Sequence, residues 1–137
     1  MHRILIRAPG RYDALEWVEE PDLTPGPGEV VIETEAVGVN YADSIIRMGL
    51  YRSARELHGY PITPGFEVAG RIAALGPDVT MRGTDNRNLE LRIGDPVIGV
   101  TLFNGYATQV KVPIEGVFRR PAQLDALQGA TIPTVFL

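Results

Sequence analysis

Few side chains in this sequence could bind a metal ion. The chain has no cysteine, and its two histidines, His2 and His58, lie far apart. Neither has a second histidine or an acidic pair at the spacing that a tetrahedral zinc site requires. Without a thiol, neither a disulfide nor a thiolate nucleophile can form. The sequence therefore predicts no zinc site and two solvent-exposed histidines.

Two glycine-rich segments approach phosphate-binding turns without meeting their requirements. Gly65–Gly70 has the spacing of a P-loop, but Arg71 and Ile72 follow where Lys and Ser or Thr are needed. Gly26–Gly28 begins like a dinucleotide-binding turn, yet it precedes a predicted strand instead of opening a helix. The sequence also has no Gly-x-Ser-x-Gly segment. The residues alone thus indicate neither a cofactor-binding turn nor a self-sufficient active site.

Short strands separated by turns are predicted along most of the chain. The clearest strand covers residues 29–39, where positions 30 to 36 alternate between a mostly apolar face and a face with Glu33 and Glu35. Residues 67–75 form another, with Gly70 inside it as a bulge or a close backbone approach. Further strands are predicted over residues 4–7 paired with 14–18, and over 96–100, 106–112 and 117–119.

Helical patterns are fewer. Residues 41–48 and 123–130 are predicted to be helical, whereas 52–64 is a polar, irregular connection and 80–92 a charged surface loop. The apolar side of the first helix comprises Ala42, Ile45, Ile46 and Met48. We therefore predict a mainly β fold with one or two short helices.

The composition excludes several classes of partner. The net charge is −4, and the 17 acidic and 13 basic residues are mixed, so no basic stripe indicates nucleic acid. No apolar run reaches transmembrane length, and the run within residues 1–7 is too short for a signal peptide. The prediction is a cytoplasmic protein that binds neither nucleic acid nor membranes.

Four motifs in order carry a resemblance to a known family. They are Asn40-Tyr41-Ala42-Asp43 followed by Met48-Gly49-Leu50-Tyr51, then Pro64 to Gly70, Gly94 to Gly99, and Gly105-Tyr106-Ala107. Each motif alone is weak, but the ordered series resembles the N-terminal domain of medium-chain dehydrogenases/reductases, in particular the quinone oxidoreductase (zeta-crystallin-like) branch. The resemblance extends from residue 3 to the end and implies a GroES-like, partly open β-barrel.

The resemblance also implies a domain organisation. Family members are two-domain enzymes in which a Rossmann domain binds NADPH or NADH at a glycine-rich turn. Residues 1–122 are then the GroES-like, substrate-side domain, and 123–137 the truncated start of a connection to an absent Rossmann domain. The chain alone is expected to be inactive. Because the apolar segment 132–137 would be exposed, a homodimer or another homo-oligomer is expected.

Two positions in the resemblance concern zinc. Zinc alcohol dehydrogenases carry Cys where Asn40 stands and His where Phe66 stands. The resemblance therefore implies a zinc-independent member, in agreement with the scarcity of metal ligands. Substrate polarisation would then come from hydrogen-bond donors instead of a Lewis acid.

The resemblance implies two site residues. Tyr51 matches an active-site tyrosine of related reductases, and as a catalytic residue it could donate a hydrogen bond or a proton to the substrate carbonyl. Its alternative role is packing against the preceding helix. Asn40 matches a residue near the nicotinamide and substrate, which implies cofactor binding. Its alternative role is the N-cap of the helix from Tyr41, and both roles can hold together.

Simpler roles are expected for the neighbours. Asp43 and Arg47 lie four residues apart on one predicted helix and could form an exposed ion pair. Glu67 matches a carboxylate beside the metal of zinc relatives, and without metal we expect it to make structural hydrogen bonds. Asn104-Gly105 predicts a tight turn, and Tyr106 is expected in the core.

The reaction implied for the parent enzyme is hydride transfer from NADPH or NADH to a quinone or an electron-poor C=C bond of a small-molecule substrate. One alternative is an enoyl-thioester reductase domain, which Tyr51 permits equally well. Another is a non-catalytic GroES-like binding module.

Overall fold

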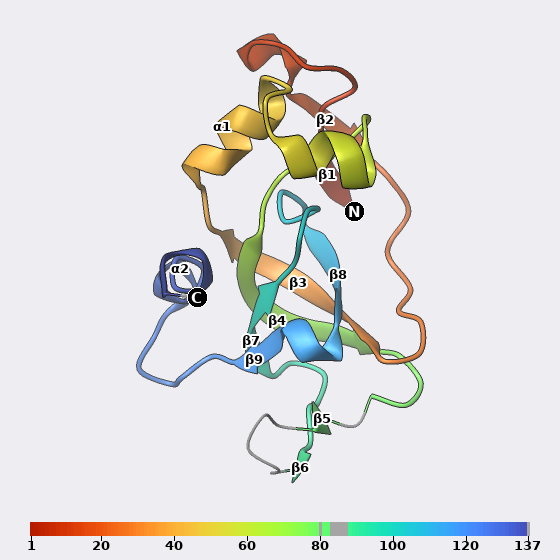
Figure 1. The fold of residues 1–137 in the computed structure, drawn as a ribbon. Helices are drawn as coiled ribbons and strands as arrows, with labels where there is room; N and C mark the ends of the chain where they lie inside the picture. The colour runs from red at the N-terminus through yellow and green to blue at the C-terminus, as the bar shows by residue number, and fades with distance from the viewer. Residues whose placement is uncertain (80, 83–87, 137) are drawn as a thin grey trace.

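The computed structural model describes residues 1–79, 81–82 and 88–136, with a five-stranded antiparallel sheet at its centre (Figure 1). The described strands are β1 (His2–Leu5), β2 (Glu16–Glu19), β3 (Glu29–Val37), β4 (Glu67–Leu75), β5 (Met81–Arg82), β6 (Asn88–Leu89), β7 (Pro96–Val100), β8 (Gln109–Pro113) and β9 (Val117–Arg119). The order across the central sheet is β8, β3, β4, β7 and β9, while β1–β2 and β5–β6 form separate pairs. The mainly β prediction is confirmed.

The strands β3 and β4 pair along most of their length, and the alternation predicted for β3 holds in part, because Val31 is buried as well as its neighbours. Val30 and Ile32 are fully buried, whereas Glu33 is exposed. Gly70 lies opposite Thr34, and a Cβ atom at Gly70 would lie 2.0 Å from the carbonyl oxygen of Glu33. The predicted close backbone approach is therefore confirmed, and only glycine fits there.

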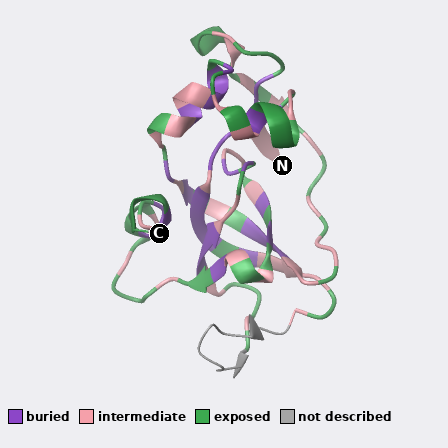
Figure 2. Ribbon diagram, viewed as in Figure 1, coloured by how far each residue is buried: buried purple, intermediate pink, exposed green. Residues whose placement is uncertain are grey.

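The larger part of the core lies on the sheet. Its buried members, purple along the strands in Figure 2, are Val30, Ile32, Val68, Ile72, Val97, Val110, Val112 and Val117. All are β-branched side chains, which pack well on a pleated surface. This cluster accounts for the hydrophobic periodicity of the predicted strands.

A second apolar cluster joins the sheet to the helix α1 (Tyr41–Arg47). It comprises Ile6, Ile46, Ala54, Ile62 and Phe103, with Tyr51, Tyr60 and Phe66 packed against it. Residues 52–64, which were predicted to form an irregular connection, contain a π-helical turn, Ala54–His58. That prediction was wrong because one buried residue, Ala54, anchors a turn whose other residues are polar or exposed.

The buried face of α1 also differs from the prediction. Asp43, Ile46 and Arg47 are its buried residues, whereas Met48 follows the helix and is 40% exposed. The apolar pattern was misleading because two charged side chains have polar partners inside the fold, described below. Burial of such groups is favourable only when their hydrogen bonds are made.

Two short helices lie near the C-terminal end of the chain: α2 (Ala126–Gly129) and α3 (Pro133–Phe136). The helix predicted over 123–130 thus begins later. Its start is set by Asp125 and Gln128, each of which accepts a hydrogen bond from the other's backbone N–H. Ala126 and Ala130 pack against Ala36 and Ala69 of the sheet. With α1, short helices are more numerous than predicted.

Two further predictions are corrected. The strand expected over 106–112 begins at Gln109, and residues 106–108 bond to β1, through Ile4 N–H to the Tyr106 carbonyl and Thr108 N–H to the His2 carbonyl. In the predicted loop 80–92, β5 pairs with β6, while residues 80 and 83–87 lie outside the described part. None of the described helices is long and apolar enough to cross a membrane.

Candidate functional site

Asn40 lies between β3 and α1, at the position of the helix N-cap. Its backbone is extended (φ −120°, ψ 154°), as is usual for an N-cap. The predicted alternative role of Asn40, the N-cap of the helix from Tyr41, is therefore confirmed. Its backbone N–H donates to Oδ2 of Asp43 at 2.8 Å, and its side-chain Nδ2 donates to Oε1 of Glu67 at 2.9 Å. The residue expected to bind the cofactor is thus held through both its backbone and its side chain.

Glu67 begins β4 and is only 2% exposed. One carboxylate oxygen accepts from Asn40, and the other accepts from the backbone N–H of Thr134 in α3 at 2.8 Å. A Cβ atom on Gly38 would lie 2.3 Å from Oε1 of Glu67, so glycine leaves the space that this carboxylate fills. The predicted structural hydrogen-bonding role is confirmed. The link to α3 had no signal in the sequence apart from a charged residue at a buried strand position.

Asp43 is the second buried carboxylate of this region. Its oxygens accept from the Gly65 N–H (3.1 Å), the Asn40 N–H (2.8 Å) and the Tyr106 hydroxyl (2.9 Å). Burial raises the pKa of Asp43 above its usual value, with a smaller contribution from the negative charge of Glu67, although the three hydrogen bonds oppose the shift. Burial and the Asp43 carboxylate also raise the pKa of Tyr106. Tyr106 is therefore half-buried and its hydroxyl donates a hydrogen bond, whereas a core side chain was predicted.

The expected ion pair between Asp43 and Arg47 is not formed. Arg47 donates to the Gly10 carbonyl at 2.6 Å, and its guanidinium lies 4.5 Å from the centroid of the Tyr12 ring. Both charged side chains are buried with other partners, so their i,i+4 spacing does not bring them together. A signal for the true role of Asp43 was present, because an acidic residue three positions after an Asn N-cap is typical of a helix start.

Tyr51 follows α1 and packs on the second apolar cluster. Its ring lies 6.0 Å from the ring of Phe66, centroid to centroid, and Phe66 lies 5.9 Å from Phe103. The predicted packing alternative is therefore confirmed as a contact, and the catalytic role stays a prediction. Phe66 immediately precedes Glu67, which holds Asn40.

Tyr51 contacts Phe66 and Asn40 contacts the next residue, Glu67, so both predicted site residues lie near the start of β4. Among the described hydrogen bonds none joins Tyr51 to Asn40 directly, and they are connected through the consecutive residues Phe66 and Glu67. A phenol and an amide are uncharged hydrogen-bond donors. Such a pair suits a substrate carbonyl or quinone oxygen on which negative charge develops.

Replacing Asp43 with Asn is expected to lower the free energy of unfolding at neutral pH by about 1–3 kcal/mol. The two carboxylate oxygens accept from separate backbone N–H groups, and an amide can match only one of them. The pKa of Asp43 is raised above 3.8 in the folded protein, so the folded state holds this proton more tightly. The stability difference, wild type minus variant, should therefore fall as pH rises above about 3.8 through the folded pKa.

Urea unfolding of both proteins from pH 4 to pH 7 measures this difference. Tyr106→Phe is the contrast: it keeps the carboxylate and removes a hydrogen bond that lowers the pKa of Asp43, so its stability difference should rise with pH instead of falling. For Asp43→Asn, a difference that rises with pH would contradict the raised pKa of Asp43.

The described residues do not fit a zinc ion of the kind that zinc relatives bind. They include no group of three or more His, Cys, Asp and Glu side chains that could hold a metal. Phe66 places a hydrocarbon ring, packed between Tyr51 and Phe103, where a histidine ligand would be required. His58 is exposed, as predicted, but half-buried His2 stacks on Trp17 with ring centroids 5.2 Å apart.

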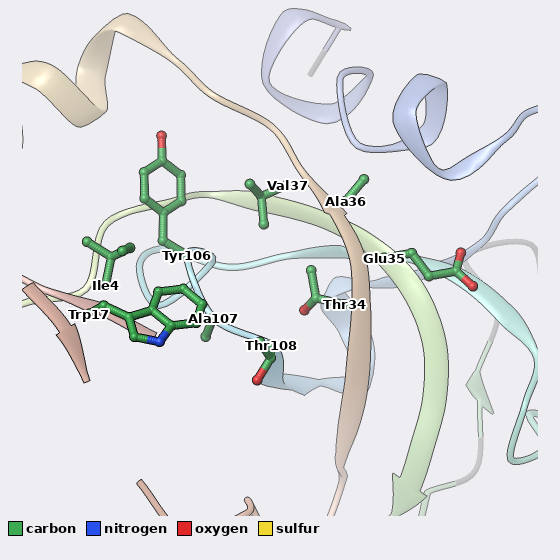
Figure 3. A pocket seen from close by; sticks show the side chains of 9 residues that line it. All are labelled: Ile4, Trp17, Thr34, Glu35, Ala36, Val37, Tyr106, Ala107 and Thr108. Atoms are coloured by element: carbon green, nitrogen blue, oxygen red, sulfur yellow. The ribbon is translucent and has the colours of Figure 1, made fainter. Parts of the chain in front are cut away.

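A pocket of about 360 Å³ lies elsewhere, between β1, β2, the end of β3 and residues 106–108 (Figure 3). Ile4, Trp17, Val37 and Ala107 make it largely apolar. Tyr106 lines it with its ring, while its hydroxyl points away toward Asp43. Neither Tyr51 nor Asn40 lines this pocket, so it is separate from the candidate site.

Comparison with known proteins places this geometry in a family. The family model for the alcohol dehydrogenase GroES-like domain matches residues 26–122. A mycocerosic acid synthase-like polyketide synthase of Mycobacterium tuberculosis is 32% identical over 96% of this chain, and a probable quinone oxidoreductase of Schizosaccharomyces pombe is 30% identical over 92%. The chain spans only 6% of the synthase and 36% of the oxidoreductase.

Solved structures agree with these matches. Human synaptic vesicle membrane protein VAT-1 homolog-like protein has a TM-score of 0.86 at 27% identity, over 99% of this chain and 40% of its own. The CurK enoyl reductase has a TM-score of 0.82 at 30% identity (98% and 40%), and an Escherichia coli quinone oxidoreductase complexed with NADPH has 0.80 at 25% (95% and 36%). The predicted GroES-like fold is thus confirmed. The chain belongs to the family of alcohol dehydrogenase GroES-like domains, in the medium-chain dehydrogenase/reductase branch that includes VAT-1 homologues and quinone oxidoreductases.

Proposed function

We propose that this chain is the substrate-side domain of an NADPH-dependent oxidoreductase that reduces quinones or activated C=C bonds by hydride transfer. The observation that carries the proposal is the convergence of Tyr51 and Asn40 on Phe66 and Glu67 at the start of β4. The likeness to quinone oxidoreductases, one of them complexed with NADPH, supports it.

In this proposal Tyr51 is the general acid. Its hydroxyl donates a hydrogen bond to the substrate oxygen and then a proton as charge accumulates there. Asn40 lies beside the nicotinamide, with its amide plane held by Glu67. Bound NADPH would supply the hydride. Because Phe66 cannot ligate a metal, polarisation falls to these neutral donors, and we propose that no zinc takes part.

We further propose that residues 1–122 are the substrate-side domain, that 123–137 begin the connection, and that a separate Rossmann domain binds most of the NADPH or NADH. The described residues offer no glycine-rich turn that opens a helix, which is where pyrophosphate binds in such domains. The 137-residue chain alone is then expected to be inactive. We also propose a cytoplasmic homodimer or other homo-oligomer.

A second candidate substrate class is enoyl thioesters. The matches to the polyketide synthase and to the CurK enoyl reductase favour it specifically. The same donation by Tyr51 would serve a thioester carbonyl, because hydride addition to the conjugated C=C bond moves charge onto that oxygen. The two substrate classes therefore use one site and are separated by experiment.

The test measures NADPH oxidation by the full-length protein that carries this domain, with a 1,4-quinone and with an enoyl thioester as acceptors. Turnover with at least one acceptor, unchanged by a zinc chelator, is the expected result. The 137-residue chain is the control and should show no measurable NADPH binding. Micromolar NADPH affinity of that chain would contradict the two-domain proposal, and NADPH binding without turnover of either acceptor would contradict the substrate classes. Absence of NADPH binding by the full-length protein would favour a GroES-like binding module.

A further inference from the structure

We propose that Glu67 is a positioning residue that fixes which way the Asn40 amide faces, and that the backbone of α3 imposes this orientation. The inference rests on the proposed function, since Asn40 is placed beside the nicotinamide there. It adds a positioning role for Glu67, and a connection to α3, that the resemblance does not assign.

The first step is the contact between Glu67 and α3. The backbone N–H of Thr134 donates to Oε2 of Glu67 at 2.8 Å. A backbone N–H can only donate, and it cannot rotate away while α3 keeps its place. Any side chain at position 67 that preserves this contact must therefore present an acceptor to Thr134.

The second step transmits this requirement to Asn40. A side-chain amide can face a neighbour with either its nitrogen or its oxygen, but a carboxylate accepts on both of its oxygens. With Oε2 occupied by Thr134, Oε1 remains for Asn40, and the amide must turn Nδ2 toward it, as the 2.9 Å hydrogen bond shows. The orientation of Asn40 thus agrees with a chemical constraint that begins in α3, together with the capping-box contact between the Asn40 side chain and the backbone of Asp43.

The third step is that the carboxylate has no freedom to relax. Glu67 is 2% exposed, and both of its hydrogen-bond donors are neutral, so no described ion pair offsets its burial. Burying an ionised group without a cation is unfavourable. Stability alone would be served equally well by a neutral side chain, whereas only a carboxylate enforces this orientation of Asn40. Side chains that do not give the most stable packing are expected at functional sites.

The substitution Glu67→Gln tests the inference, because it keeps the shape and reverses the orientation. Thr134 would hold Oε1 of the glutamine, whose Nε2 would then face Asn40 and turn the Asn40 oxygen toward it. In the full-length protein we expect kcat to fall about tenfold or more, with the NADPH KM changed less than about threefold. The Asn40 side-chain NH2 protons, assigned by NMR through their loss in Asn40→Asp, should exchange slowly in the wild type and fast in the variant.

Glu29→Gln is the matched control. Glu29 lies at the end of β3 that is far from Asn40. Its carboxylate accepts a hydrogen bond from the Gly26 N–H and forms an ion pair with Lys111. It should leave kcat and the Asn40 protons unchanged. Unchanged kcat per folded molecule, or unchanged NH2 exchange in Glu67→Gln, overturns the proposal. If the wild type reduces no acceptor, the proposed function fails, whereas the NH2 exchange still decides whether Glu67 orients Asn40.

A second variant covers the case in which Glu67→Gln does not fold. In Asn40→Asp/Glu67→Gln, the glutamine Nε2 can donate to the new carboxylate while its oxygen accepts from Thr134. This restores a complete hydrogen-bond set with the wrong group at position 40. The double variant should fold and remain about tenfold or more below wild-type kcat. Wild-type kcat in it would overturn the proposal.

Discussion

Replacing Tyr51 with phenylalanine is expected to lower kcat/KM for the reduced acceptor by about 10²- to 10⁴-fold, the range typical of a lost general acid. The phenylalanine ring can keep the contact with Phe66 and the packing on the second apolar cluster, so the change removes the hydroxyl and little else. A steady-state comparison in the full-length protein measures the effect. The loss should appear in kcat, because the proton is donated as the transition state forms.

Tyr12→Phe is the control for this prediction. Tyr12 is 79% exposed and contacts the guanidinium of Arg47, away from Phe66. It should leave kcat/KM unchanged. A Tyr51→Phe protein with wild-type kcat/KM would assign Tyr51 to packing alone. Thermal unfolding of both variants within about 4 °C of the wild type shows that a lost fold is not the cause.

Replacing Gly70 with alanine is expected to destabilise the domain by about 3 kcal/mol or more, at the upper end of overpacking effects. The new Cβ atom would lie 2.0 Å from the carbonyl oxygen of Glu33 and 3.0 Å from Cγ2 of Ile32. The carbonyl belongs to the neighbouring strand and cannot move unless β3 and β4 separate. Urea unfolding of the variant beside the wild type gives the difference.

The same substitution at Gly26 separates this clash from the general effect of Gly→Ala. A Cβ atom at Gly26 would approach only Oε2 of Glu29, at 3.0 Å, which is the end of a flexible side chain. We expect a change within about 1 kcal/mol, since alanine also restricts the unfolded chain. Equal losses at Gly26 and Gly70 would show that the interstrand contact is not the cause.

The fold was predictable where one physical signal dominated. Alternation predicted β3 because Val30 and Ile32 lie on the buried core, and Gly70 indicated a close approach because no other residue fits there. The prediction failed for α1, where Asp43 and Arg47 are buried and Met48 is not. Hydrophobic periodicity counts charged residues as exposed, and it cannot detect partners such as Gly10 or Tyr106 that are distant in sequence.

The resemblance supplied candidate site residues, but not the contacts that hold them. Tyr51 and Asn40 were identified by resemblance, and Asn40 also by its position before a helix. The contacts that join them to Phe66 and Glu67 depend on the pairing of β3 with β4 and on the packing of α1. The hydrogen bond from Thr134 to Glu67 spans 67 positions, and no local pattern encodes such a contact.

Trp17 is the only tryptophan of the chain, and its position has a spectroscopic consequence. It is 64% exposed, stacks on His2 at a 14° interplanar angle, and lines the pocket that lies apart from Tyr51 and Asn40. Its emission will therefore respond to the contents of that pocket. In this domain, a change in intrinsic fluorescence on adding a ligand would report events at the N-terminal hairpin, and an unchanged signal would say nothing about Tyr51 and Asn40.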